Sequence, residues 1–201
     1  YDMSETMYDV MISQTPYGAP YYLPYVLFSY NDYYDMYDSY DEILKPEYAS
    51  ILPDMFYSGE YSSDEINDVM PSIPIDIMRD DVFSEIVSDY NHPIRVALRE
   101  NDLYDWVPES LMRIYHSTGD ELVPVENSEI AYNQFINNGA DPNNIELATI
   151  DLGTHQDAAP WILISVYYWF QELVDSQEFL LGDMDLNLVL DVLDVITLVN
   201  I

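Results

Sequence analysis

The sequence predicts an α/β fold in which a parallel β–α–β–α unit follows a long, mostly helical segment. Two short apolar runs, Leu111 to Tyr115 and Ile145 to Leu152, each lead into a turn, as buried strands do. Helical patterns follow the runs, over residues 126–138 and 158–174. No strand pattern occurs between residues 14 and 110, so that segment is expected to be a helical insertion.

Composition places limits on the class of protein. At 201 residues the chain fits one domain, or a domain with a small module. Its hydrophobic fraction of 49% is enough for a core. No apolar run reaches about 18 residues, so no membrane span is expected. The chain has no cysteine, which excludes disulfides and thiolate sites.

The charge is strongly negative. Thirty-eight acidic residues face five basic ones, for a net charge of -33. Such a surface repels phosphate backbones, so a nucleic-acid partner is not expected. Two explanations stay open: an acidic surface adapted to a salty habitat, and local sites for divalent cations.

The first sixty residues combine prolines with many tyrosines. Residues 1–13 are expected to form a loop and a short helical turn, and Pro16, Pro20 and Pro24 to break any long helix. Tyrosines then recur at helical spacing from Tyr30 to Tyr40, which predicts a helix with an aromatic stripe. That helix would either pack on the body or cap a substrate pocket.

Start signals for three further helices follow. Ser62 with Glu65 three residues later has the pattern of a capping box, and Pro71 stops the helix. Asp80 begins a second helix, and Pro93 suits the first turn of a third.

In the β–α–β–α unit, Pro124 precedes the first helix and Gly139 occupies its expected left-handed end. Asp157 is expected to cap the second helix, with Pro160 in the first turn. Strands joined by one helix pair in parallel, so both strands should end at the same edge of a sheet.

Each strand is followed by a side chain suited to acid–base chemistry. Asp120 lies in the turn after the first strand and His155 in the turn after the second, 35 residues later. A serine hydrolase needs a histidine to take the hydroxyl proton and a carboxylate to orient that histidine. A turn aspartate and a helix-start histidine are the plain alternatives, and their joint position at strand ends favours catalysis.

The stretches YHSTGDELVPVENSEIAYNQFINNGA and LGTHQDAA resemble the C-terminal part of α/β-hydrolases, nearest the secreted esterase/lipase-like and prolyl-oligopeptidase-like branches. The resemblance implies that Asp120 is the triad acid and His155 the base, with Glu121 as the alternative acid. It makes His116 a structural histidine, and Ser117 stands where glycine is usual. No cofactor is implied for catalysis.

The sequence contains no Gly-x-Ser-x-Gly, so the nucleophile and the first oxyanion-hole donors are expected upstream of this chain. Ser4, Ser117 and Ser128 do not follow the strand–elbow–helix pattern, and the chain alone is expected to be inactive. The family resemblance makes residues 14–110 a variable lid. Tyrosines near its start are expected to pack against an acyl chain or an aromatic ester: Tyr17, Tyr21, Tyr22 and Tyr25.

The tail resembles one half of a dockerin repeat, an EF-hand-like calcium module. The expected ligands follow the calcium-loop spacing, with a backbone carbonyl at the seventh position: Asp183, Asp185, Asn187, Val189, Asp191 and Asp194. Leu188 stands where such loops have glycine. The resemblance implies an extracellular or cell-surface location and a cohesin-like or cell-surface partner. An acidic amphipathic helix without calcium is the alternative.

The leading hypothesis is therefore the C-terminal part of a secreted serine hydrolase that cleaves carboxylic esters. A prolyl-oligopeptidase-like peptidase and a non-catalytic, calcium-dependent surface or scaffold-binding protein are the alternatives. The expected organisation is a post-strand segment (1–13), a helical lid (14–110), the hydrolase core (111–175), a linker (176–181) and the calcium half-repeat (182–201).

Overall fold

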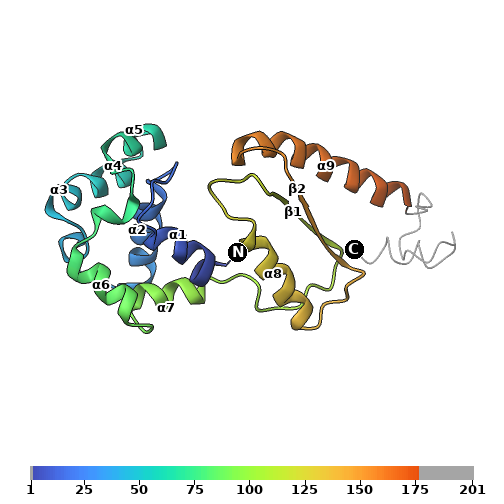
Figure 1. The fold of residues 1–201 in the computed structure, drawn as a ribbon, viewed down its shortest axis with the longest axis horizontal. Helices are drawn as coiled ribbons and strands as arrows, with labels where there is room; N and C mark the ends of the chain where they lie inside the picture. The colour runs from blue at the N-terminus through green and yellow to red at the C-terminus, as the bar shows by residue number, and fades with distance from the viewer. Residues whose placement is uncertain (1, 177–201) are drawn as a thin grey trace, which may run out of the picture. The chain divides into compact units, whose positions relative to one another are not determined.

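The structure is a computed structural model that describes residues 2–176. The chain divides after Ala158 into two compact units. Within the first unit, a helical region of residues 2–100 precedes a small parallel sheet (Figure 1). The fold is thus mixed helical and α/β, as predicted.

Short helices make up the first hundred residues, and the order is η1 (Met3–Met7), α1 (Tyr8–Ile12), α2 (Tyr22–Tyr34), η2 (Tyr40–Glu42), α3 (Pro46–Ala49), α4 (Leu52–Ser58), α5 (Ser63–Val69), η3 (Pro74–Ile77), α6 (Asp80–Ser88) and α7 (Pro93–Glu100). The absence of strands from residues 14–110 is confirmed, apart from one antiparallel bridge between Leu44 and Met78.

The predicted helix from Tyr30 to Tyr40 is wrong in both of its bounds. Helix α2 begins at Tyr22 and ends at Tyr34, because Asp35 adopts a left-handed conformation with φ 49°. Pro24 does not break this helix, because it lies in the first turn, where a missing N–H has no intrahelical partner to lose. The prolines therefore mark a helix start where the sequence indicated a loop.

The other start signals are confirmed. Ser62 and Glu65 form a reciprocal capping box at α5, and Asp80 begins α6. Pro93 is the first residue of α7, whose cap is His92: its ring accepts a hydrogen bond from the Ile94 N–H. A histidine cap needs a neutral ring with a free lone pair on Nδ1.

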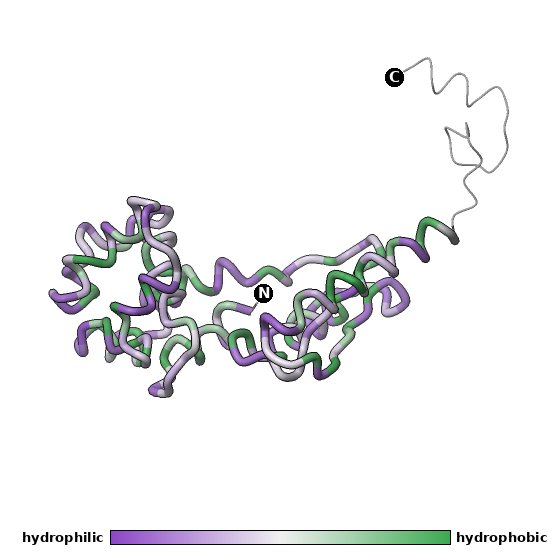
Figure 2. The backbone as a smooth tube through the Cα atoms, turned by 90° about the horizontal axis from the view of Figure 1, so that it is seen from above, coloured by the Kyte–Doolittle hydropathy of each residue, from purple (hydrophilic) through white to green (hydrophobic). Residues whose placement is uncertain are grey.

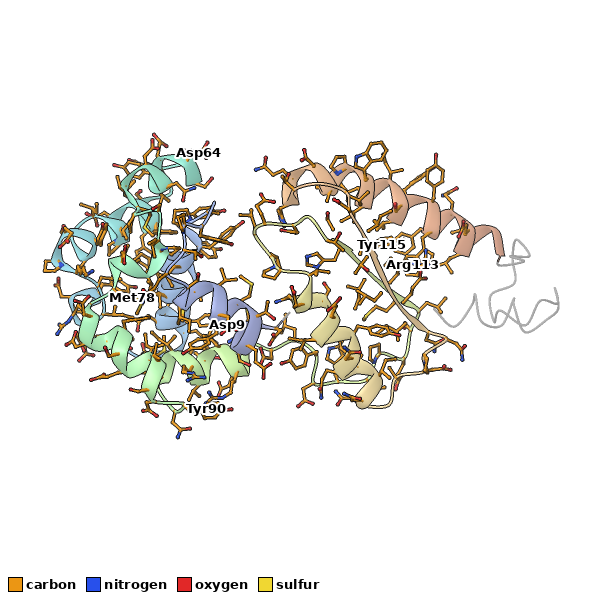
Figure 3. All side chains as sticks on the ribbon, in the orientation of Figure 1. Asp9, Asp64, Met78, Tyr90, Arg113 and Tyr115 are labelled. Carbon is orange, nitrogen blue, oxygen red and sulfur yellow. The ribbon has the colours of Figure 1, made fainter. Side chains whose placement is uncertain are left out.

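The helical region has a hydrophobic core of its own. Its fully buried members come from loops as well as helices: Leu44, Leu52, Ile77 and Ile86 are 0% exposed. Met78, labelled in Figure 3, lies among them. Hydrophobic stretches recur at short intervals along the chain, as Figure 2 shows, so each short helix contributes one side to this core.

The sheet consists of β1 (Met112–Ser117) and β2 (Ile145–Ile150), paired in parallel with Met112 opposite Ile145 and Ser117 opposite Ile150. The parallel pairing is confirmed. The first strand runs two residues past the predicted end at Tyr115, so His116 lies in the strand, and the second ends two residues before Leu152.

Helix α8 (Glu126–Asn137) connects the strands and packs Ala131 and Phe135 against Ile145 in a second, smaller core. Gly139 follows with φ 103°, which confirms the positive φ expected at this helix end.

Helix α9 (His155–Ser176) starts earlier than predicted, at His155 rather than Ala158. The predicted cap is also wrong, because Asp157 lies inside the first turn. Thr154 and Asp157 instead bond reciprocally: Thr154 Oγ1 accepts from the Asp157 N–H, and Asp157 Oδ2 accepts from the Thr154 N–H and hydroxyl. Among the described residues, no helix is both long and apolar enough to cross a membrane.

The N-terminal segment is anchored at the buried Asp2. Its carboxylate accepts from the N–H and hydroxyl of Thr6 and from the Tyr104 hydroxyl. Its carbonyl accepts from the Asn127 side chain in α8, at 2.9 Å. These bonds join the first residues to α8, 125 positions along the chain.

Candidate active site

The turns after β1 and β2 lie side by side because the strands pair in parallel. Ser117, the last residue of β1, joins them. Its hydroxyl donates to the Gly153 carbonyl at 2.7 Å and accepts from the Leu152 N–H at 3.1 Å. Ser117 is only 1% exposed. The serine at the position where the resembled family has glycine thus forms a hydrogen-bonded link between the two turns.

Two glycines allow this close approach. A Cβ on Gly119 would lie 2.8 Å from the Gly153 carbonyl oxygen, so only glycine fits there. Gly153 has φ 83°, a conformation that L side chains rarely adopt. The two turns therefore meet backbone to backbone, and the side chains that follow them are held near each other.

Asp120 is fixed on both carboxylate oxygens. Oδ1 accepts from the N–H groups of Leu122 and Val123, at 3.0 and 2.9 Å. Oδ2 accepts from Nδ1 of His155 at 2.7 Å. The carboxylate is 8% exposed, so these bonds hold it in one orientation with little competition from water.

Two opposing effects act on the Asp120 carboxyl. Burial on its own raises its pKa. Hydrogen bonds from Val123 N–H, the His155 ring and Leu122 N–H favour the charged form and outweigh burial, so the pKa lies below its ordinary value. Asp120 is consequently an ionised acceptor at neutral pH.

The tautomer of His155 follows from that acceptor. An ionised carboxylate has no proton to donate, so Nδ1 of His155 must carry the proton. In the neutral ring Nε2 then holds a lone pair. The side chain is 45% exposed, and within residues 2–176 no protein group bonds to Nε2. This is the protonation pattern that a general base requires.

Glu121, the alternative acid, contacts the backbone rather than the ring. Its Oε2 accepts from the His155 N–H at 3.0 Å, at the start of α9. Of the two neighbouring acids, Asp120 orients the imidazole and Glu121 stabilises the helix terminus that presents it.

His116 is occupied elsewhere. Its Nε2 donates to the Val123 carbonyl at 2.9 Å, and its Nδ1 lies 2.6 Å from the Ser128 hydroxyl. Nε2 lies 3.6 Å from Asp120 Oδ2, too far for a hydrogen bond. The structure thus places His116 beneath the turn, where it supports Val123, one of the donors to Asp120.

The serines weighed as substitutes for the nucleophile are all engaged. Ser4 donates to Asp102 at 2.6 Å, Ser117 to the Gly153 carbonyl, and Ser128 contacts the His116 ring. None of these bonds is to His155.

The four tyrosines of the expected lid separate into two groups. Tyr17 and Tyr22 line an apolar pocket formed by η1, α1 and α2. Tyr21 stacks on Tyr22, with ring centroids 4.3 Å apart, and Tyr25 is exposed near Phe56. The first pair therefore faces a cavity.

The described residues hold no group of three or more potential metal-binding side chains. The expected calcium ligands lie outside the described residues: Asp183, Asp185, Asn187, Val189, Asp191 and Asp194.

Some functional contacts were missed from the sequence. Ser117 looked like a mild departure from the family pattern, yet it joins the two turns. Tyr17 donates to the Leu122 carbonyl, 105 residues away, and no local pattern predicts such a pair. The Thr154–Asp157 cap could have been predicted from the sequence, because a hydroxyl residue precedes an acid by three positions, as in a capping box.

A parallel β1–α8–β2 unit, with an acid in the turn after β1 and a histidine at the start of α9 just after β2, is an α/β-hydrolase-like arrangement. Solved structures agree with it. A Legionella pneumophila protein described as a hydrolase matches with a TM-score of 0.77 and 26% identity, over 90% of this chain and 47% of its own. The rice cell wall degrading esterase LipA of Xanthomonas oryzae matches with a TM-score of 0.67 and 22% identity, over 89% of this chain and 49% of its own.

A ligand-bound form of the same esterase has a TM-score of 0.62, at 22% identity, over 78% of this chain and 41% of its own. The chain thus spans about half the length of the structures it matches. No protein-family model matches the sequence, and no curated protein does. What the structural matches share with this chain is an α/β-hydrolase-like fold.

Proposed function

We propose that the chain is the C-terminal part of a secreted serine hydrolase that cleaves carboxylic esters through an acyl-enzyme. One observation carries the proposal: His155 Nδ1, at the start of α9, lies 2.7 Å from Asp120 Oδ2, in the turn after the neighbouring parallel strand. The names of the structural neighbours, a hydrolase and an esterase, support the same class of reaction.

In the proposed mechanism, His155 Nε2 removes the proton from a serine hydroxyl supplied by residues upstream of this chain. The serine oxygen attacks the ester carbonyl, and the resulting imidazolium is stabilised by ionised Asp120. His155 then gives the proton to the departing alkoxide. Water, deprotonated by the same nitrogen, releases the acid and restores the serine.

The net charge of -33 bears on the charge of the substrates that the protein would accept. A strongly acidic surface slows the approach of anionic esters and leaves neutral ones unaffected. Neutral carboxylic esters are therefore the proposed substrates.

The test uses the polypeptide with its upstream segment and a neutral p-nitrophenyl ester. His155→Ala and Asp120→Asn should each lower kcat by about 10³-fold or more, with an unchanged circular dichroism spectrum. Glu121→Gln is the matched control, since within residues 2–176 the Glu121 carboxylate accepts from the His155 N–H and not from its ring, and it should change kcat by a few-fold at most. Near-wild-type turnover in either of the first two variants would reject the assignment.

We also propose, from sequence spacing alone, that residues 182–201 bind calcium and serve a cell-surface or scaffold partner. Calcium titration by calorimetry should give saturable heat that Asp183→Ala weakens. The absence of heat in the wild-type protein would end this part of the proposal.

A further inference from the structure

Tyr17 joins the helical region to the turn that carries Asp120. Its backbone N–H donates to the Ser72 carbonyl at 2.9 Å, which fixes it to the segment between α5 and η3. Its side chain is half-buried, and the hydroxyl donates to the Leu122 carbonyl at 2.9 Å. Both residues belong to the first compact unit, although 105 positions separate them in the sequence. The bond therefore ties the helical region to the acid-bearing turn.

The backbone next to Tyr17 is packed against the same turn. A Cβ on Gly18 would lie 3.3 Å from a Leu122 methyl, so the glycine backbone and the leucine side chain are in close contact. The hydroxyl thus bonds at a place where the two segments already touch, and its bond has little freedom to change direction.

The accepting carbonyl belongs to the peptide group whose N–H donates to Asp120. The Leu122 C=O and the Val123 N–H are two ends of one planar amide. That N–H bonds Asp120 Oδ1 at 2.9 Å, and Oδ2 of the same carboxylate accepts from His155 Nδ1 at 2.7 Å. A donor on the carbonyl oxygen polarises the amide and makes its N–H a stronger donor. The Tyr17 hydroxyl therefore acts on the carboxylate through a single amide that is fixed at both ends.

His116 fixes the next carbonyl along the turn. Its Nε2 donates to the Val123 oxygen at 2.9 Å. Tyr17 and His116 thus hold two consecutive carbonyls. The N–H groups of those same two residues, Leu122 and Val123, both donate to Asp120 Oδ1. Since His116 belongs to β1 and Tyr17 to the helical region, the orientation of the carboxylate depends on both parts of the unit.

We propose that Tyr17 is a positioning residue for the Asp120–His155 pair and acts through the Leu122–Val123 amide. Without the hydroxyl, the Val123 N–H donates more weakly, and Asp120 Oδ2 is aimed less firmly at His155 Nδ1. The consequence for catalysis rests on the proposed function: kcat and kcat/KM should fall together, as they do when an interaction of the transition state is weakened.

Amide and histidine-ring NMR of the 201-residue chain tests the positioning without the nucleophile. Tyr17→Phe keeps the ring and removes the hydroxyl. We expect the Val123 amide signals to shift. The ratio of the Nδ1–H to the Nε2–H tautomer of His155 should fall by about two- to tenfold, the range that one neutral hydrogen bond gives.

Tyr34→Phe is the matched control, because it removes a tyrosine hydroxyl that bonds Asn101, outside the acid-bearing turn. It should leave the Val123 signals and the His155 tautomer ratio unchanged. Val123 signals that stay in place in Tyr17→Phe, or a tautomer ratio that responds equally to both variants, would overturn the proposal.

A change that strengthens the bond covers the case in which Tyr17→Phe does not fold. Replacing Tyr17 by 3-fluorotyrosine, introduced at that position alone, keeps the hydroxyl and makes the phenol a stronger donor. The Val123 amide signals should again shift, and those of Asn101 should not. An unmoved Val123 amide would overturn the proposal.

Turnover by the longer polypeptide separates this inference from the proposed function. With a neutral p-nitrophenyl ester, Tyr17→Phe should lower kcat by about two- to tenfold. It should add no further loss in an Asp120→Asn background, because both changes act on one carboxylate. A full additional loss there would overturn action through Asp120. If His155→Ala leaves turnover intact, the proposed function fails, and the NMR signals still decide the positioning. If turnover depends on His155 but Tyr17→Phe behaves like Tyr34→Phe, the positioning role fails.

Discussion

Replacing Asp120 by asparagine is expected to reverse the tautomer of the His155 ring. In the native site the ionised Oδ2 accepts from Nδ1 at 2.7 Å, so the proton of the neutral ring lies on Nδ1. Asparagine keeps one oxygen for the N–H groups of Leu122 and Val123 and turns its NH₂ group toward the ring. Because that group donates, Nδ1 must accept, and the ring proton moves to Nε2.

The size of the effect follows from the bond that is lost. A hydrogen bond to a charged group contributes about 1.5–3 kcal/mol. His155 is 45% exposed, so solvent screening puts this bond at the lower end, about 1.5 kcal/mol or roughly tenfold in the tautomer ratio. That tenfold change is one part of the expected loss. Asparagine also carries no charge to stabilise the imidazolium, so kcat in the longer polypeptide should fall by about 10³–10⁴, the size typical of replacing a triad aspartate by asparagine.

Nitrogen-15 NMR of the histidine rings measures the tautomer without needing the nucleophile. The chain has only three histidines, so single substitutions of His92 and His116 assign the signals. We expect a protonated Nδ1 in the wild-type protein and in Glu121→Gln, and a protonated Nε2 in Asp120→Asn. The same tautomer in the wild-type and Asp120→Asn proteins would refute the reasoning about orientation.

Four further predictions concern stability. Ser117→Ala should lower the free energy of unfolding by about 1–3 kcal/mol, because it leaves buried backbone groups without partners. Ser84→Ala is the control: Ser84 is exposed and its hydroxyl bonds the Asp80 carbonyl within its own helix, so the change should be less than about 0.5 kcal/mol, and equal losses on urea denaturation would contradict the link between the turns. Gly119→Ala should destabilise the chain and broaden the His155 ring signals, because the new Cβ would clash with the Gly153 carbonyl; an unchanged spectrum and urea midpoint would contradict this. Burial lowers the pKa of His92 below its ordinary 6.5, and the charges of Glu85 and Asp89 only partly oppose this. The unfolded chain therefore binds the His92 proton more readily than the folded chain. Stability should fall as the pH drops below about 6.5. His92→Asn, which keeps a capping oxygen, should flatten that dependence in urea titrations, and an identical slope would refute it. Because the net charge is -33, raising NaCl from about 0.05 to 0.5 M should raise Tm, and a Tm that falls or stays constant would count against self-repulsion.

The sequence predicted the parts of the site that depend on local patterns. Asp120 and His155 follow short apolar strands, and a parallel pair joined by one helix must bring its strand ends together. The two residues do lie close together in the structure, where His155 Nδ1 is 2.7 Å from Asp120 Oδ2. Their catalytic roles stay a prediction.

Tertiary contacts were beyond the same reasoning. The tyrosine spacing from Tyr30 to Tyr40 indicated a helix, but the chain turns at Asp35 into a left-handed conformation and the later tyrosines pack separately. Pro24 read as a helix breaker although a proline is tolerated in a first turn. The Tyr17–Leu122 bond joins residues 105 positions apart, and only the packed fold brings them together.

In the proposed mechanism, His155, oriented by Asp120, activates a serine located upstream of this chain. Fluorophosphonate labelling of the longer polypeptide, followed by peptide mass spectrometry, tests it most directly. We predict one labelled serine, upstream of Tyr1, with labelling lost in His155→Ala and retained in Glu121→Gln. No labelled serine, or labelling that persists in His155→Ala, would contradict the account.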